Sequence, residues 1–325
     1  MLFRSWGLSA DELPAPARRV PVELPALVHA ALVDYPRYTD PESGGAASPE
    51  RLLDWMGLQR RLREGFPAEL MAVGFSGWKR ASLTRFLAGS RLLPGFDMVA
   101  DWDGSAGRGY ANDGDGRDAD PSDPGDWVSS SDQTADAGRY GDCAVQSSSW
   151  HGTTVTGIIA ATAGNGEGVA GANWGVRILP VRVAGKCGAS VSDIVDGMRW
   201  AAGLAVCQTW SNSQDPNGSC TRWAPTNPNP ARVVNISFGG AASCNAAYQS
   251  AIDELWAKGI LVVAAGGNDH GAPSRPANCN HVLGVAALNR DGFKANYSNF
   301  GAALGLATVG RSEEHTSELQ SHSFI

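Results

Sequence analysis

The sequence predicts an α/β fold with a doubly wound parallel sheet, and three features of the chain beyond residue 150 predict it. Strand-like runs such as VVNIS and ILVVAA are apolar on both faces, as expected for strands that helices cover on both sides. Helical patterns alternate with these runs along the chain. Glycine-rich turns follow the strands. In sheets of this kind, ligands bind at the carboxyl ends of the strands.

Composition and charge exclude several classes of protein. The chain has 325 residues, 43% of them hydrophobic, and it reads as a soluble globular protein. A formal charge of -7 argues against a nucleic-acid or anionic-membrane surface, since both need a basic face. No apolar run is long enough to span a membrane, and the start MLFRSWGLSADELPAPARR lacks the features of a signal peptide. We therefore expect a monomer with no nucleic-acid or membrane partner.

The amino-acid composition of the chain changes near residue 90. Residues 1–90 are rich in Arg, Leu and Pro and contain no cysteine, and SPERLLDWMGLQRRLREGF has the pattern of an amphipathic helix with Ser48 as a cap. From about residue 92, Gly, Asp and Ser dominate, and residues 111–127 read as a long polar loop. We expect a helical unit at 1–90, a second unit at 91–310 and a separate tail at 311–325.

Beyond residue 150 the elements follow in regular order. Apolar spacing predicts helices at 151–163, from a Ser190 cap through about 205, and at 245–258 before Gly259. Short apolar runs predict strands at 176–183, 232–237, 260–265 and 282–287.

The six cysteines all lie between Cys143 and Cys279. An even number confined to one region suits disulfides formed in an oxidising compartment. A zinc site is the alternative, but no pair has the CxxC spacing that would bring two thiolates to one metal. Disulfides imply export, which conflicts with the absence of a visible export signal.

His151 opens a predicted helix in the run WHGTTVTG, and a single histidine of this kind is more often structural than catalytic. Four further blocks follow it in order: GNGEGVAGANWGVRILPVRV, VVNISFGG, ILVVAAGGND and ANYSNFG. Together these blocks resemble the histidine half of the subtilisin family of secreted bacterial serine proteases. The resemblance implies a subtilisin-like sheet and makes His151 the general base that takes the proton of the nucleophilic serine.

The resemblance also implies the rest of a candidate site. Ser237, Phe238 and Gly239 match a strand that pairs its backbone with the substrate chain, although a buried strand ending in a glycine turn is the alternative. Asn268 matches the side chain that donates to the oxyanion, and its alternative is an ordinary turn asparagine. The implied substrate is a polypeptide.

The resemblance further implies three disulfides, Cys143 with Cys187, Cys244 with Cys279, and Cys207 with Cys220. We expect no cofactor and no metal. A calcium ion held by the acidic loop is possible in principle, because hard cations bind carboxylates, but a solvated loop is the favoured interpretation. The acidic residues concerned are Asp113, Asp115, Asp118 and Asp120.

Two family features have no counterpart in the sequence. The strand ending in Asp-Thr-Gly that should precede RLLPGFDMVAD is absent, and we assign its role to none of Asp97, Asp101 and Asp103. The Gly-Thr-Ser segment that should carry the nucleophile is absent as well. Residues 311–322, RSEEHTSELQSH, resemble a translated sequencing adapter, so we exclude Ser312, Ser317 and Ser321 as nucleophiles.

The first ninety residues resemble a different family. LVDYPRYTDPESG and AVGFSGWKRASLTRFLAG are similar to capsular-polysaccharide export and Kdo-transferase proteins. A protease propeptide is the alternative for this segment. We therefore expect a fragment of a secreted subtilisin-like endopeptidase that is inactive as written. The competing functions are a noncatalytic peptide-binding pseudoprotease and the remnant of a capsular-polysaccharide enzyme.

Overall fold

A parallel sheet forms the centre of the molecule, as the sequence predicts. The structure is a computed structural model, and it describes residues 69–74, 91–100, 110–165, 169–211, 218–289 and 292–310. Over these residues the main sheet has the strand order β10-β9-β8-β7-β1-β4-β2, and β3 pairs with β1. Every neighbouring pair in it is parallel. The α/β architecture with a parallel sheet that the sequence predicts is therefore confirmed.

The strands of the main sheet are β1 (Glu69–Gly74), β2 (Phe96–Asp97), β3 (Arg177–Ile178), β4 (Val181–Arg182), β7 (Val233–Ile236), β8 (Leu261–Ala265), β9 (Val282–Leu288) and β10 (Leu304–Val309). A separate antiparallel hairpin consists of β5 (Cys207–Trp210) and β6 (Cys220–Trp223).

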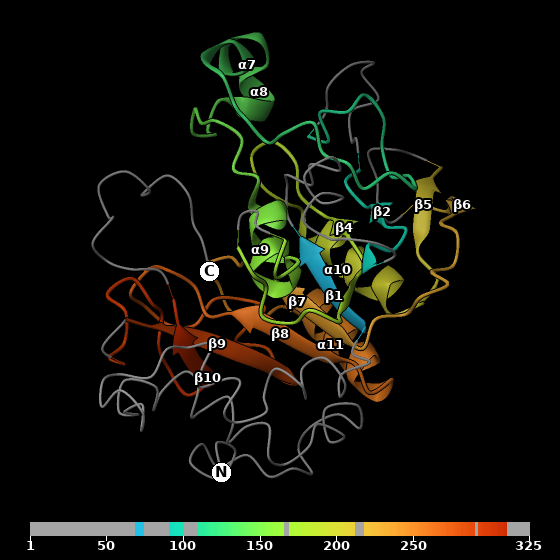
Figure 1. Cartoon of the computed structure of the whole chain (residues 1–325). Coiled ribbons are helices and arrows are strands. Elements are labelled where there is room, and N and C mark those ends of the chain that lie inside the picture. Colours follow the sequence, from blue (N-terminus) through green and yellow to red (C-terminus); the bar gives the residue numbers. More distant parts are fainter. Residues whose placement is uncertain are drawn as a thin grey trace, which may run out of the picture.

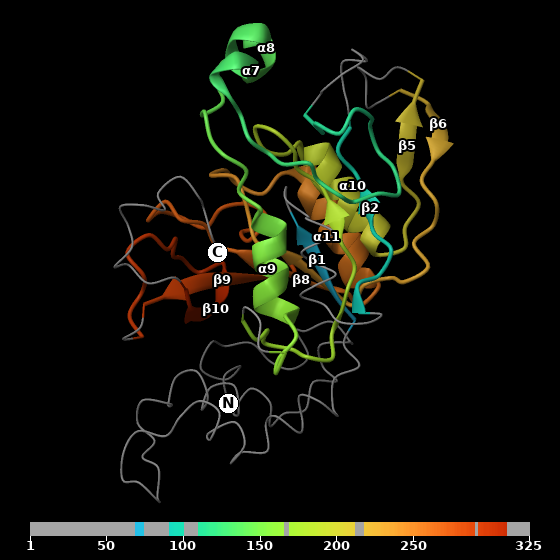
Figure 2. The same ribbon diagram turned by 45° about the horizontal axis from the view of Figure 1, so that its top comes forward.

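Helices cover both faces of the main sheet (Figures 1 and 2). On one face, α9 (His151–Ala160) packs on β1 and β3. On the other face, α10 (Val191–Ala201) packs on β4 and on α11 (Ala246–Ala257), which in turn packs on β8. Two short helices, α7 (Ser130–Ala135) and α8 (Ala137–Tyr140), lie in the segment that leads to α9.

Local sequence signals explain the boundaries of α10 and α11. The Ser190 side chain accepts a hydrogen bond from the Asp193 N–H, and the Asn245 side chain accepts one from the Tyr248 N–H. Both are N-caps that satisfy a backbone donor of the first turn. Gly259 follows α11 with a φ of 72°, a left-handed conformation that ends a helix without steric cost in glycine.

The sheet contains a central strand that the sequence analysis did not predict. Strand β1, from the segment expected to be a foreign helical unit, occupies the place between β7 and β4. Its pairing with both neighbours satisfies the backbone groups at the middle of the sheet. In the sequence, β1 is followed by Phe75-Ser76-Gly77 rather than by Asp-Thr-Gly.

Other differences from the sequence expectations are smaller. The strand expected at 176–183 is divided into β3 and β4, with Leu179 and Pro180 between them, and proline has no N–H to donate to a ladder. The helix expected at 151–163 ends at Ala160. The amphipathic helix expected around residues 48–66, and the tail at 311–325, lie outside the described residues. Among the described helices, none is long and apolar enough to cross a membrane.

Candidate active site

The three sequence-predicted site segments meet the carboxyl edge of the sheet (Figure 1). Ile236, the last residue of β7, pairs with Ala264 of β8, so residues 237–239 and the loop after β8 leave neighbouring parallel strands at the same edge. Helix α9 leads back into β3, so it runs against the strand direction and begins at this edge with His151. The structure thus places the candidate base, binding strand and oxyanion donor on one side of the sheet, where α/β proteins bind ligands.

His151 is buried, with 7% of its surface exposed. Burial disfavours the charged imidazolium and lowers the pKa of His151 to about 4, and the negative charge of Asp126 opposes this shift. The ring is therefore neutral at pH 7, which is the state a general base requires.

The start of α9 is fixed by Asp126 and Ser149. The Ser149 N–H and hydroxyl donate to the two Asp126 carboxylate oxygens, each at 2.7 Å, and the His151 N–H reaches the Ser149 hydroxyl at 3.4 Å. Trp150 lies between them in the left-handed region with a φ of 50°. A bulky residue there is strained, and the surrounding contacts must hold it. Asp126 therefore contributes to the placement of the candidate base through Ser149.

A second set of contacts anchors the segment that approaches His151. Lys186 is buried between the rings of Trp127 and Tyr140 and donates to Asp132 at 3.0 Å. The next residue along, Cys187, forms the disulfide to Cys143. The loop between β4 and α10 thus holds residues 127–143 by an ion pair, two aromatic contacts and a covalent bond.

Replacing Asp132 with asparagine should lower the free energy of unfolding by about 2 kcal/mol, because a buried lysine loses its counter-ion and Ser129 loses a charged acceptor. In the wild type, the hydrogen bonds from Ser129 lower the pKa of Asp132 to about 2. Urea unfolding followed by tryptophan fluorescence measures the loss. Asp136→Asn is the matched control, since Asp136 forms only a 3.5 Å ion pair with Arg139 at the surface and its amide would keep the helix cap. Equal losses in the two variants would contradict this role of Asp132.

Residues 237–239, the candidate binding strand, follow the last residue of β7 and belong to no strand of the sheet in the structure. The Ser237 hydroxyl accepts a hydrogen bond from the Asn235 side chain at 2.9 Å. The backbone of Gly240 exchanges two hydrogen bonds with Arg275, at 3.0 and 3.2 Å. A Cβ on Gly239 would lie 2.4 Å from the Arg275 carbonyl oxygen, so glycine is required for this approach. Gly239 itself is exposed, which leaves its backbone accessible to an extended chain.

Asn268 lies in the loop after β8, where its Oδ1 is buried without a hydrogen-bond partner among the described residues. The loop is built around Gly267, which has a φ of 108°. The Asn268 side chain as a whole is half-buried. Asn268 therefore directly follows a turn whose left-handed backbone suits glycine.

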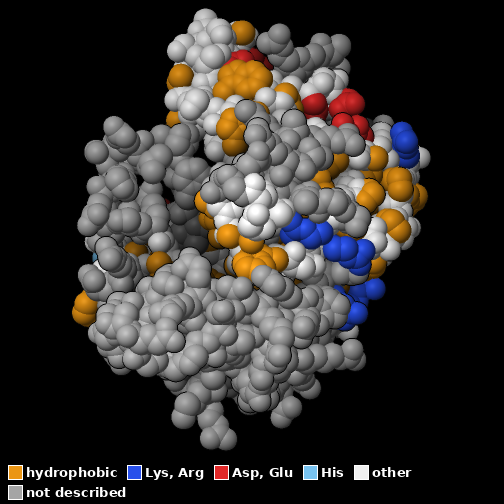
Figure 3. Space-filling model, viewed as in Figure 1, with side chains coloured by type: hydrophobic (Ala, Val, Ile, Leu, Met, Phe, Trp, Pro, Cys, Tyr) orange, Lys and Arg blue, Asp and Glu red, His pale blue; other side chains and the backbone are white. Residues whose placement is uncertain are grey.

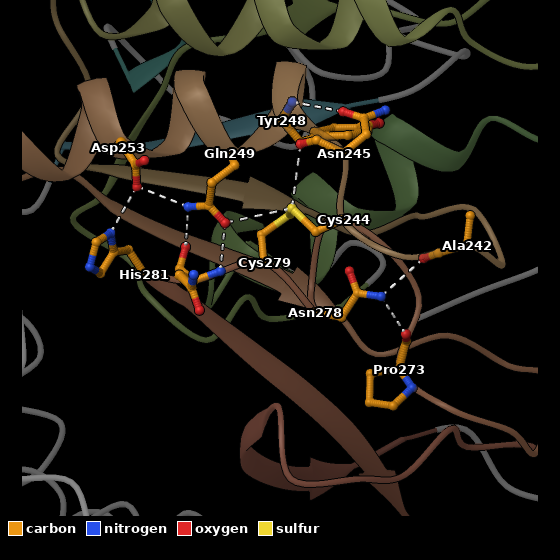
Figure 4. Close-up of a disulfide and its surroundings, with 11 residues drawn as sticks. Ala242, Cys244, Asn245, Tyr248, Gln249, Asp253, Pro273, Asn278, Cys279 and His281 are labelled. Atoms are coloured by element: carbon orange, nitrogen blue, oxygen red, sulfur yellow. Dashed lines mark hydrogen bonds and ion pairs between the residues drawn. A yellow bond between two sulfur atoms is a disulfide. The ribbon is translucent and has the colours of Figure 1, made fainter.

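All three disulfides expected from the resemblance are confirmed. Cys143 pairs with Cys187, Cys207 with Cys220 and Cys244 with Cys279, with Cα atoms 5.6, 5.7 and 5.1 Å apart. Figure 4 shows how the third one joins the loops of the site. Beside it, the Asn278 amide donates to the carbonyl oxygens of Ala242 and Pro273, at 2.9 and 2.8 Å. The loop after β7 and the loop after β8 are thereby tied to each other.

The acidic loop is organised by arginine and by its own backbone. Asp113 forms an ion pair with the buried Arg182, and Asp118 and Asp120 each accept a hydrogen bond from a backbone N–H two residues ahead. Figure 3 shows acidic side chains gathered on the surface at the upper right, where Figure 1 draws this loop. Within the part of the chain that the structure describes, no group of three or more His, Cys, Asp or Glu side chains is arranged to hold a metal.

Two residues of the site were missed by sequence reasoning. Asp126 and Asn299 act on Ser149 and on the Asn268 loop over separations of 23 and about 30 residues. No local spacing marks such pairs. Asp126 falls in the stretch read as a solvated polar loop, and Asn299 falls in the block ANYSNFG, which carried the resemblance without pointing to a particular residue.

Several known proteins and one family model are similar to this chain. The model of the subtilase family matches residues 86–324. An extracellular protease of Xanthomonas campestris pv. campestris is 40% identical over 225 residues, which are 69% of this chain and 34% of that protein. An extracellular basic protease of Dichelobacter nodosus is 42% identical over 223 residues, which are 67% of this chain and 33% of that protein.

A solved structure of a protease from Pseudoalteromonas arctica PAMC 21717 superimposes with a TM-score of 0.60 at 38% identity, over 75% of this chain and 63% of that one. The chain spans about a third of the length of the two curated relatives. The family match covers most of the chain and includes α9, the strand before residues 237–239 and the Asn268 loop. The chain therefore belongs to the subtilase family.

Proposed function

We propose that the chain is a part of the catalytic domain of a secreted subtilisin-like serine endopeptidase that cleaves polypeptides. Membership of the subtilase family supports this proposal, and the relatives from Xanthomonas campestris and Dichelobacter nodosus are named extracellular proteases. The three disulfides suit an oxidising compartment outside the cell.

The observation that carries the proposal is the buried, neutral His151 at the sheet edge where residues 237–239 and Asn268 also lie. In the proposed reaction, the nucleophilic serine attacks the scissile carbonyl and gives its proton to His151. The Asn268 amide donates to the oxygen that becomes negative. Residues 237–239 pair with the substrate backbone and hold the carbonyl in place. The proposed reaction therefore uses the side chains of His151 and Asn268 and the backbone of residues 237–239, and we propose no cofactor for it.

We further propose that residues 1–325 by themselves bind an extended peptide without hydrolysing it. The family's Asp-Thr-Gly strand and Gly-Thr-Ser segment have no counterpart in this sequence, and β1 is followed by Phe75-Ser76-Gly77. Without the nucleophile and the orienting carboxylate, a triad retains only the contribution of the oxyanion donor and of binding.

The test uses the purified chain with an N-terminally fluorescein-labelled octa-alanine peptide. Fluorescence anisotropy should show saturable binding that weakens roughly tenfold when alternate peptide nitrogens are methylated, because each methyl removes a donor to the strand. Chromatography of the same mixture should show no cleavage, and a fluorophosphonate probe should label no serine.

Each other outcome decides a different part of the proposal. Cleavage or labelling that disappears in His151→Ala would show that the chain supplies its own nucleophile, and the proposed inactivity would be wrong. Binding that is insensitive to methylation would remove the pairing role of residues 237–239. Absence of both binding and cleavage would overturn the assignment of this edge as a peptide site. Stable monomeric binding without cleavage in the natural full-length protein would favour the noncatalytic peptide-binding alternative.

A further inference from the structure

Asn299, in the loop between β9 and β10, is 1% exposed and uses the full hydrogen-bonding capacity of its side-chain amide. Its Nδ2 donates to the Gly266 carbonyl oxygen at 3.0 Å and to the Ser274 hydroxyl at 3.1 Å. Its Oδ1 accepts from the backbone N–H groups of Asp269 and Gly271, at 2.8 and 2.9 Å. A single side chain therefore bonds to four points of one loop.

These four points enclose Asn268. Gly266 precedes it, and Asp269 and Gly271 follow it. The Asn299 backbone N–H adds a fifth bond, to the Gly267 carbonyl oxygen at 2.9 Å. A Cβ on Gly267 would lie 2.2 Å from the Asn299 Nδ2, so the loop fits against this amide only with glycine there. Asn268 thus lies inside the segment that these bonds fix, and its own amide oxygen has no partner among the described residues.

Asn299 is itself fixed to the sheet. The Ser298 hydroxyl accepts a hydrogen bond from the Ala287 N–H in β9 and donates to the Asn299 carbonyl oxygen, both at 2.9 Å. The Phe300 N–H donates to the Gly271 carbonyl oxygen at 2.9 Å. The amide is therefore held on a rigid strand before it holds the loop.

The same amide reaches the candidate binding strand. Ser274, which accepts from the Asn299 Nδ2, also donates its backbone N–H to the Gly266 carbonyl oxygen at 2.9 Å. The next residue, Arg275, exchanges two backbone hydrogen bonds with Gly240, directly after Gly239. One chain of contacts thus joins the oxyanion-donor loop to the strand that would pair with the substrate.

We propose that Asn299 is a positioning residue, which sets the geometry of Asn268 relative to residues 237–239 and does not touch the substrate. The inference rests on the proposed function, because it gives Asn299 a role in the reaction only if Asn268 is the oxyanion donor. A buried asparagine can also serve the fold alone, and this chain contains one. Asn227 is 2% exposed, donates to the Ala201 carbonyl oxygen at 3.0 Å and accepts from the Asn229 N–H at 2.8 Å.

The first test follows amide hydrogen exchange in the purified chain. In Asn299→Ala, the amides of Asp269 and Gly271 should exchange at least about tenfold faster than in the wild type, because their acceptor is removed. Asn227→Ala is the matched control and should leave both amides unchanged. If the two amides keep their protection in Asn299→Ala, the proposal is wrong, whatever the peptide measurements give.

The second test compares two N-terminally labelled tetra-alanine peptides, one ending in a free carboxylate and one in an amide, at pH 7.5. The carboxylate places an anionic oxygen where the oxyanion would form, so a charge-assisted bond from Asn268 should make the acid bind about tenfold more tightly than the amide. Asn268→Ala should abolish this preference. Asn299→Ala should reduce it to the same extent without contacting the peptide, whereas Asn227→Ala should preserve it.

A conservative variant keeps the inference testable if Asn299→Ala does not fold. Asn299→Asp retains the acceptor for Asp269 and Gly271, so protection of both amides should be restored to within about threefold of the wild type, with the acid preference retained. Exchange as fast as in the alanine variant would overturn the proposed mode of action. If the wild type shows no acid preference, the role of Asn268 in the proposed function fails, and the exchange data still decide whether Asn299 holds the loop.

Discussion

Replacing Arg182 with leucine should lower the free energy of unfolding by about 3–5 kcal/mol at pH 7.5, because it leaves three carboxylates without their shared cation. The Arg182 side chain is fully buried and forms ion pairs with Asp97, Asp113 and Asp123. Burial alone would lower the pKa of this guanidinium, but the carboxylates more than offset that effect and raise it. The side chain also donates to the Ala111 carbonyl oxygen.

The loss of unfolding free energy in Arg182→Leu should depend strongly on pH. Asp97 is almost completely buried, and this burial already raises its pKa even though the charge of Arg182 opposes the shift. Without Arg182 the pKa of Asp97 should rise further, so that this carboxyl is protonated in the folded variant at mildly acidic pH. The destabilisation should therefore shrink when urea unfolding is measured at pH 5 instead of pH 7.5. Arg199→Leu is the matched control, because Arg199 pairs with Glu254 where the two side chains are 26% and 41% exposed. Such a pair contributes less than about 1 kcal/mol. Similar losses for both arginines would contradict the prediction.

The ion pairs of Arg182 also bear on the candidate site. Arg182 lies at the end of β4 and holds Asp123, three residues before the Asp126 that anchors Ser149 and the start of α9. Disruption of this network should therefore also release the segment that approaches His151. The ion cluster around Arg182 is thus connected through residues 123–126 to the start of the helix that carries the candidate base.

The elements with strong local signals could be predicted from the sequence. Helix α11 was bounded by Asn245 and Gly259, which act as its N-cap and as the left-handed residue after its end. Strands β7 and β8 were found because helices cover both of their faces and their residues are accordingly apolar. Strand β1 was missed because its place depends on pairing with β7 and β4, more than a hundred residues away in the chain.

Some residues of the candidate site could likewise be predicted from the sequence and others could not. His151, Asn268 and residues 237–239 stand in contiguous motifs, so a resemblance could point to them. Asp126 and Asn299 act through single side-chain contacts with distant backbone, and a polar residue in a loop has no pattern that distinguishes such a contact from solvation. Similarly, Asp97 could not be interpreted from its motif, and its role is the buried pair with Arg182.

The burial that suits His151 for proton transfer should also make the chain sensitive to acid. In the unfolded state, the pKa of histidine is near 6.5, whereas burial lowers the pKa of His151 to about 4 in the folded state. Between these values the unfolded state binds more protons, so the contribution of His151 to stability is complete above pH 6.5 and is lost as the pH falls toward 4. The difference corresponds to a loss of about 3 kcal/mol.

His151→Gln isolates this contribution, because glutamine does not titrate and all other groups remain. Urea unfolding of both proteins at pH 7.5, 6.5, 5.5 and 4.5 should show a constant stability difference near and above neutrality. Below pH 6.5 the variant should gain on the wild type by about 1.4 kcal/mol per pH unit. A stability difference that stays flat would mean that the folded protein accepts the charge on His151, and a difference of opposite sign would mean that it prefers the charged ring. In either case the imidazole would be solvated or paired, and the buried, neutral base on which the proposed reaction depends would not exist.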